Sequence, residues 1–81
     1  MPDKDSEKYV AVLVALSSAE DAAAMARTLV EEELAACGQV VGPIRSIYRW
    51  QGRIEDEPEA LLILKTRAGV FEALKERVLE L

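Results

Sequence analysis

Two continuous apolar runs stand out in the hydrophobic pattern of the chain. One covers Tyr9–Leu16 and the other covers 60–64, and both are built from aliphatic residues. Short runs of this kind, enriched in Val, Ile and Leu, are typical of strands buried on both faces. We therefore expect each run to be a central strand of a sheet.

Helical spacing of apolar residues follows each run. Ser17-Ser18 ends the first strand, Ser18 with Asp21 resembles a capping box, and Gly38 is a natural C-terminal cap. Thr66 is suited to cap the second helix. The positions three and four apart predict that the first helix buries Ala22, Met25, Ala26, Leu29, Val30, Leu34 and Cys37, and that the second buries Val70, Phe71, Leu74, Val78 and Leu81.

Between the helices, the sequence predicts a long hairpin of two strands, 39–50 and 54–66. Gln51-Gly52 supplies the turn, because Gly tolerates positive φ. Gly42-Pro43 interrupts the first of these strands, which indicates an edge strand or a bulge. Alternation places Ile44, Ser46, Tyr48 and Trp50 on one face, and Arg45, Ile47 and Arg49 on the other.

The predicted order is strand, helix, strand, strand, helix. This is the α+β, ferredoxin-like order βαββαβ without its fourth strand. We expect one domain over residues 1–81, with a flexible start at residues 1–8. The first strand is left with an open hydrophobic edge, so either residues after Leu81 were removed or another chain covers that edge.

Composition narrows the function classes. The chain has 81 residues, a formal net charge of −5, one Cys and no His, and it contains no Asn. Without His, serine-type triads and the commonest neutral metal ligand are excluded. The negative net charge argues against nucleic acid as the main partner. No apolar run is long enough to span a membrane. The polar first residues are not typical of a signal peptide. One cysteine fits a cytoplasmic protein without disulfides.

Four motifs resemble those of a known protein family. The segments 29–32, 34–37, 46–55 and 62–67, in this order, closely resemble the CutA divalent-cation tolerance proteins, and the resemblance runs from about Tyr9 onward. It implies a non-enzymatic, cytoplasmic homotrimer that pairs strands between subunits through the long hairpin. It also implies a response to divalent metals, copper above all. The trimer is similar in shape to the PII signalling proteins, so the alternative function is a signalling module that binds a small effector in clefts between subunits. A purely structural assembly domain is a third hypothesis.

The chain departs from this family pattern at its expected metal ligands. Family copper sites draw on a Cys at the end of the first strand, where this chain has Val14, and on a His that this chain lacks. The segment that usually follows the second helix, with a further strand and helix, is also absent. The remaining soft ligand is Cys37, for which burial in the first helix is the favoured interpretation.

Other candidate residues lie on the hairpin. Glu55, Glu57 and Glu59 share a strand face and are candidate ligands for a hard cation, although a solvated edge that pairs with arginines is the favoured interpretation. Tyr48 and Trp50 are candidates for a ligand cleft or, preferably, for anchors of the trimer contact. The same cleft or interface is expected to include Arg49, Glu59 and Lys65.

Overall fold

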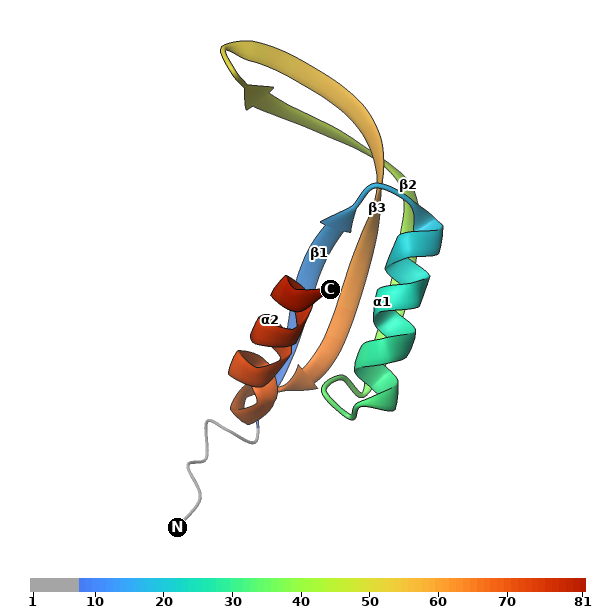
Figure 1. Cartoon of the computed structure of the whole chain (residues 1–81), viewed down its shortest axis with the longest axis vertical. Coiled ribbons are helices and arrows are strands. Elements are labelled where there is room, and N and C mark those ends of the chain that lie inside the picture. The colour runs from blue at the N-terminus through green and yellow to red at the C-terminus, as the bar shows by residue number, and fades with distance from the viewer. Residues whose placement is uncertain (1–7) are drawn as a thin grey trace.

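The computed structural model describes residues 8–81, so the expected flexible start lies, except for Lys8, outside the described residues. The elements follow the predicted order. They are β1 (Tyr9–Leu16), α1 (Ala19–Glu31), β2 (Cys37–Trp50), β3 (Arg53–Arg67), a short 3-10 turn η2 (Ala68–Val70) and α2 (Phe71–Glu80). Figure 1 shows this α+β arrangement, in which the sheet continues upward into a long projecting hairpin.

The sheet is antiparallel and has the order β1-β3-β2. β1 pairs with β3 along its whole length, from Tyr9 opposite Arg67 to Leu16 opposite Ala60. β2 lies at the edge, and its register with β3 shifts between Val41 and Ile44. The prediction of an edge strand with a bulge at Gly42-Pro43 is thus confirmed on both counts.

Beyond the bulge, β2 and β3 continue as a two-stranded ribbon. We call residues 44–59 the hairpin arm. Gln51 and Gly52 form its two-residue turn with φ values of 51° and 77°, which places both residues in the left-handed region. The molecule measures 50 × 25 × 20 Å because the arm projects past the helices. The predicted turn is confirmed.

One layer of helices covers one face of the sheet. Residues of β3 alternate in direction, and its even-numbered residues from Ala60 to Thr66 are buried. They pack against α1 and α2 in a single core made of Ala22, Ala26, Leu29, Ala35, Ala60, Leu62, Leu64 and Leu74. Both helices therefore lie on the same side of the sheet (Figure 1).

No helix formed by residues 8–81 covers the opposite face of the sheet. In register, Leu13 lies beside Ile63, and Ala15 lies beside Leu61, which in turn lies beside Val41. Leu13 is 65% exposed and Tyr9 is 83% exposed. We call this surface the open sheet face; it comprises Tyr9, Ala11, Leu13, Ala15, Val41, Leu61 and Ile63. The prediction that Tyr9–Leu16 is buried on both faces is wrong for one chain, because the described part of the chain supplies a single helical layer.

α1 begins as predicted and ends earlier than predicted. The backbone N–H of Asp21 donates to the Ser18 hydroxyl at 3.0 Å, so the N-cap is confirmed. The helix stops at Glu31 because Glu33 adopts φ 61° and reverses the chain. The N–H of Leu34 then donates to the Leu29 carbonyl at 2.9 Å, which closes a Schellman-type end.

Three predicted roles around this helix end are therefore wrong. Gly38 is no helix cap but a residue of β2 that packs against α1, and Cys37 is the half-buried first residue of β2 rather than part of the helical stripe. Val30 is exposed, since the helix turns it away from the core.

The start of α2 also differs from its prediction. Thr66 lies in β3 and its hydroxyl donates to the Leu34 carbonyl at 2.8 Å, so it ties β3 to the turn after α1. A 3-10 turn precedes α2, and no side chain caps the helix. Leu74 is fully buried, but Leu81 is 49% exposed because the helix ends there, at the rim of the core.

Gly38 supplies a direct test of the packing between α1 and β2. A Cβ at this position would lie 2.8 Å from the Cβ of Ala26. We expect Gly38→Ala to lower the free energy of unfolding by about 1–3 kcal/mol, since an added methyl group forces packed elements apart. Urea denaturation measures the change.

Gly42→Ala is the matched control, because its added Cβ would meet its nearest neighbour, the Cα of Ala60, at an ordinary 3.5 Å. A loss of stability in Gly42→Ala equal to that in Gly38→Ala would contradict this explanation.

Candidate functional site

The hairpin arm has one acidic and aromatic face. Its register sets Tyr48 opposite Glu55, Ser46 opposite Glu57, and Ile44 opposite Glu59. Directly opposed residues of antiparallel strands share a face. The three glutamates thus form one row with Tyr48 and Trp50 beside it, and the predicted division of the arm into two faces is confirmed.

The other face of the arm carries a bidentate, solvent-exposed ion pair. Arg45 donates to both carboxylate oxygens of Asp56, from Nε at 2.8 Å and from a terminal nitrogen at 2.6 Å. Hydrogen bonding to this guanidinium lowers the pKa of Asp56. Arg45 therefore has its acidic partner within its own chain, on the face away from the glutamate row. Ile47 and Ile54 lie on the same face and are 64% and 60% exposed.

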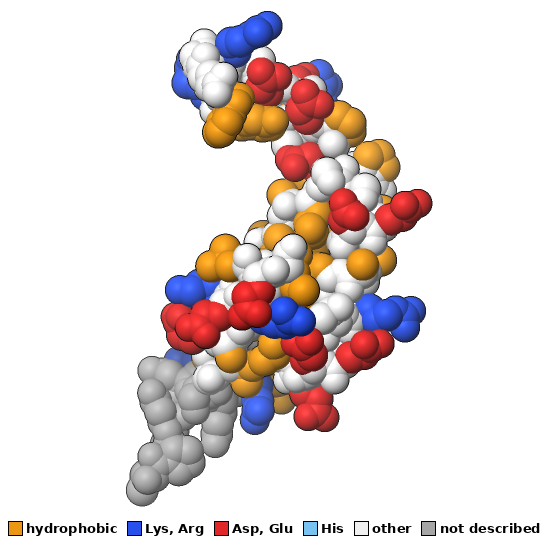
Figure 2. All heavy atoms as spheres, viewed as in Figure 1, with side chains coloured by type: hydrophobic (Ala, Val, Ile, Leu, Met, Phe, Trp, Pro, Cys, Tyr) orange, Lys and Arg blue, Asp and Glu red, His pale blue; other side chains and the backbone are white. Residues whose placement is uncertain are grey.

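The acidic row affects the titration of Tyr48. The pKa of its phenol is raised, first by partial burial and then by the negative charges of Glu57, Glu55 and Glu59. Tyr48 nevertheless remains 43% exposed, and Trp50 is 61% exposed. Figure 2 shows acidic side chains along the arm, basic ones at its tip, and hydrophobic ones on the inner side of its curve. The arm is thus an exposed, charged and partly apolar surface.

Cys37 and Lys65 lie at the far end of the sheet from the arm. They are direct partners in register, and Ala11 lies on the other side of Lys65, so the Cys37 thiol belongs to the face without helices. Lys65 and Glu59 share a face of β3, as expected. Six residues of strand separate them by about 20 Å, so within one chain they do not line a common hollow.

The predicted metal ligands do not assemble into a cluster in one chain. Within residues 8–81, no group of three or more His, Cys, Asp or Glu residues lies close enough to hold a metal ion. Glu55, Glu57 and Glu59 follow one another at about 7 Å along the strand, too far for three to hold one ion. Cys37 is remote from all of them. Their role as metal ligands remains a prediction.

The open sheet face was not singled out from the sequence as a candidate surface. The open sheet face is a continuous apolar patch on three strands, and its centre is formed by Leu13, Leu61 and Ile63. The signal was present, because unbroken apolar runs place hydrophobic residues on both faces of β1 and β3. The sequence prediction treats both runs as strands buried on both faces and identifies only the edge of β1 as open.

The fold and surface define a class: a small α+β protein with one helical layer, an uncovered apolar sheet face and a projecting acidic hairpin. A family model described as "CutA1 divalent ion tolerance protein" matches residues 10–81. The chain belongs to this family, and the resemblance found in its motifs is confirmed.

Curated relatives share much of the sequence. "Divalent-cation tolerance protein CutA" of Thermus thermophilus is 49% identical over 67 residues, which are 83% of this chain and 65% of that protein. "Protein CutA, chloroplastic" of Arabidopsis thaliana is 39% identical over 69 residues, which are 85% of this chain and 38% of that protein. The chain thus spans less than two thirds of the length of these relatives.

Solved structures share the fold. The "Divalent cation tolerance protein (Cut A1)" of Thermus thermophilus superposes with a TM-score of 0.82 at 46% identity, over 88% of this chain and 69% of that chain. The "Periplasmic divalent cation tolerance protein CutA" of Archaeoglobus fulgidus gives a TM-score of 0.83 at 34% identity, over 88% and 69%. In residues 8–81, neither helix has the length and apolar character required to cross a membrane.

The acidic row can be tested through the titration of Tyr48. We expect Glu57→Gln to lower the pKa of the phenol, because the glutamate charge opposes formation of the phenolate. Ultraviolet absorbance of tyrosinate measures this in a Tyr9→Phe background, which leaves Tyr48 as the single tyrosine.

Asp56→Asn provides the control, since Asp56 points to the opposite face of the arm. Its effect on the pKa of Tyr48 should be smaller, and equal shifts in the two variants would contradict the assignment of faces.

Proposed function

We propose that the chain is a subunit of a non-enzymatic, homotrimeric divalent-cation tolerance protein that acts in the cellular response to metal ions, copper above all. Membership of the CutA1 family supports the tolerance function. The observation that carries the assembly is the uncovered apolar sheet face. We place the protein in the cytoplasm because its single cysteine fits a protein without disulfides, although the similar Archaeoglobus protein is described as periplasmic.

The open sheet face favours association on energetic grounds. Burying a leucine or isoleucine side chain contributes about 1.5–3 kcal/mol, and this face presents several such side chains side by side. A second copy offers the same aliphatic surface, so closed symmetric assembly would bury the patches of all copies. Three copies are what the family resemblance implies. The sheet order β1-β3-β2 is also that of a ferredoxin-like subunit without its fourth strand.

The hairpin arm supplies a second contact. It extends beyond the core of its own chain and carries exposed apolar residues on both faces, among them Ile47, Trp50 and Ile54. Exposed aromatic residues of this kind are common anchors of protein interfaces. In the proposed trimer the arm lies against a neighbouring subunit and pairs strands with it.

The residues of one chain do not fit a copper site. Neither family ligand is present, and no acidic or thiol cluster forms among residues 8–81. Cys37 lies on the face that the proposal places between subunits, so thiols from neighbouring copies are the candidate soft ligands. The glutamate row, with Tyr48 and Trp50 beside it, is the candidate for harder cations or for a cleft between subunits.

Trp50 tests the arm as an interface. We expect Trp50→Ala to weaken assembly by about 2 kcal/mol or more per interface, because an aromatic anchor loses its buried contacts. Light scattering across a dilution series measures the mass of the assembly.

Leu79→Ala is the control for this experiment, since Leu79 is a 79% exposed apolar residue of α2, away from the arm. Unchanged assembly in Trp50→Ala, or equal weakening in both variants, would overturn the role given to the arm.

Copper calorimetry tests the metal function. We expect saturable copper binding by the unaltered protein and its loss in Cys37→Ser, because Cys37 is the single thiol of the chain. Glu57→Gln should leave the copper affinity unchanged, as carboxylates favour harder cations. Absence of copper binding in the unaltered protein would remove the copper assignment and favour the PII-like alternative.

A further inference from the structure

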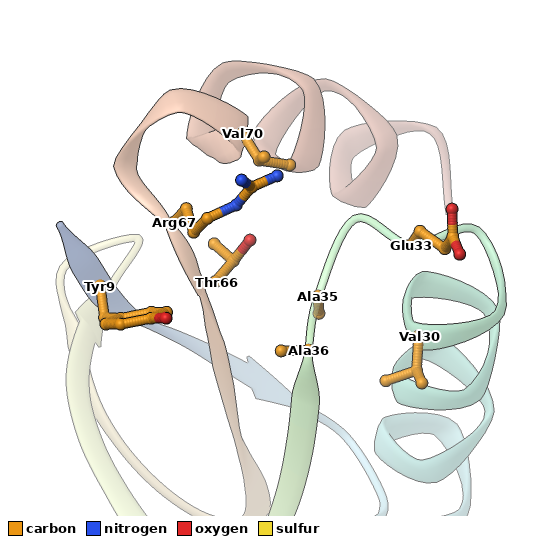
Figure 3. A pocket seen from close by; sticks show the side chains of 8 residues that line it. All are labelled: Tyr9, Val30, Glu33, Ala35, Ala36, Thr66, Arg67 and Val70. Atoms are coloured by element: carbon orange, nitrogen blue, oxygen red, sulfur yellow. The ribbon is translucent and has the colours of Figure 1, made fainter. Parts of the chain in front are cut away.

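A hollow lies at the end of the sheet opposite the arm. It has a volume of about 540 Å³, within the range of small-molecule sites. The ends of β1 and β3, the turn after α1 and the η2 turn surround it (Figure 3). Its lining residues are Tyr9, Val30, Glu33, Ala35, Ala36, Thr66, Arg67 and Val70.

Two residues of opposite charge line this hollow on different walls. Arg67 comes from the end of β3, and Glu33 comes from the turn after α1. Figure 3 shows the guanidinium of Arg67 reaching inward below Val70, with Glu33 at the far side of the hollow and the Tyr9 hydroxyl pointing inward. Within the described part of the chain, neither Arg67 nor Glu33 has an ion pair with a side chain. Their neighbours Glu32 and Arg77, in contrast, bind each other at 2.8 Å.

The wall that carries Glu33 is held firmly. The N–H of Glu33 donates to the Val30 carbonyl at 3.0 Å, and the N–H of Ala36 donates to the Lys65 carbonyl at 2.8 Å. The hydroxyl of buried Thr66 holds the Leu34 carbonyl. Glu33 itself has φ 61°, a position at which helices usually place glycine. The carboxylate of Glu33 thus occupies a backbone position that favours a residue without a side chain.

The rest of the hollow is apolar. Val30 and Val70 stand on opposite sides, and the small side chains of Ala35 and Ala36 leave space between them. The ring of Tyr9 adds an aromatic wall beside Arg67, its direct partner in register. Such a lining accepts a short hydrocarbon group and leaves the two charged side chains to orient the ligand.

We propose that this hollow binds a small zwitterion, namely a free α-amino acid with an apolar side chain. The ligand carboxylate pairs with Arg67 and its ammonium group pairs with Glu33, while Val30, Val70 and Tyr9 contact its side chain. A simple anion would gain from Arg67 but face repulsion from Glu33, and a simple cation would meet the reverse. A ligand with both charges satisfies both walls. This site is independent of the metal function and of the arm.

Calorimetric titration with free L-leucine tests the chemical class. Saturable heat is expected in the millimolar range or below. N-acetyl-leucine lacks the ammonium charge, and leucinamide lacks the carboxylate. Each should bind at least about tenfold more weakly, because one charge-assisted contact is lost. No saturable heat with leucine at about 20 mM would overturn the proposal, as would equal affinity for either analogue.

Substitutions test the two residues. Arg67→Gln and Glu33→Gln should each weaken leucine binding by about tenfold or more. Arg27→Gln is the control, since Arg27 is exposed on α1 outside the hollow and should leave the affinity unchanged. Thermal unfolding of each variant verifies that the fold is intact. Unaltered affinity in both pocket variants, or equal loss in Arg27→Gln, would contradict the site.

Discussion

The structure depends on one constraint: a sheet made largely of aliphatic strands has helices on one face only. Leu62 and Leu64 of β3 are fully buried against α1 and α2, while Leu13 and Ile63, one position away in the pleat, face outward. The aliphatic residues of these strands form the buried core on the face that the helices cover. In a chain of this size, the same aliphatic composition leaves hydrophobic side chains exposed on the open sheet face. Stability and assembly are therefore linked, and the proposed assembly would cover the open sheet face.

The arm, like the open sheet face, exposes apolar side chains that its own chain does not cover. Past the bulge between Val41 and Ile44, the two strands lose their helical cover and become a ribbon with charges on both faces. The Arg45–Asp56 pair fastens one face, and the glutamate row dominates the other. A two-stranded ribbon that leaves Ile47, Trp50 and Ile54 exposed is at best marginally stable alone. Contact with another copy would supply the apolar partner that its own chain does not.

Much of the fold could be predicted from sequence because the local signals agreed with one another. Continuous runs gave β1 and the central part of β3, Ser18 gave the start of α1, and Gln51-Gly52 gave the hairpin turn. The end of α1 was missed because Glu33 takes a left-handed conformation that no local signal announces. Gly38 was misassigned because its role depends on tertiary structure: the residue packs against Ala26 of α1.

The candidate sites were less predictable than the fold. Alternation correctly placed Tyr48 and Trp50 on one face of β2 and the three glutamates on one face of β3, because both strands of the arm keep a period of two. The register that brings the two sets together was not predicted. The distance between Glu59 and Lys65 depends on strand length, and the placement of Arg67 and Glu33 around one hollow depends on two turns far apart in the sequence. Pairings of this kind arise from tertiary structure, so a linear pattern does not reveal them.

The central claim is that other copies of the chain cover the open sheet face. Sedimentation equilibrium of the unaltered protein over a wide concentration range tests it most directly. If three copies assemble as proposed, the protein should sediment as a single species with three times the 8.9 kDa mass of one chain. A mass of 8.9 kDa at every concentration, with the chain folded, would contradict it.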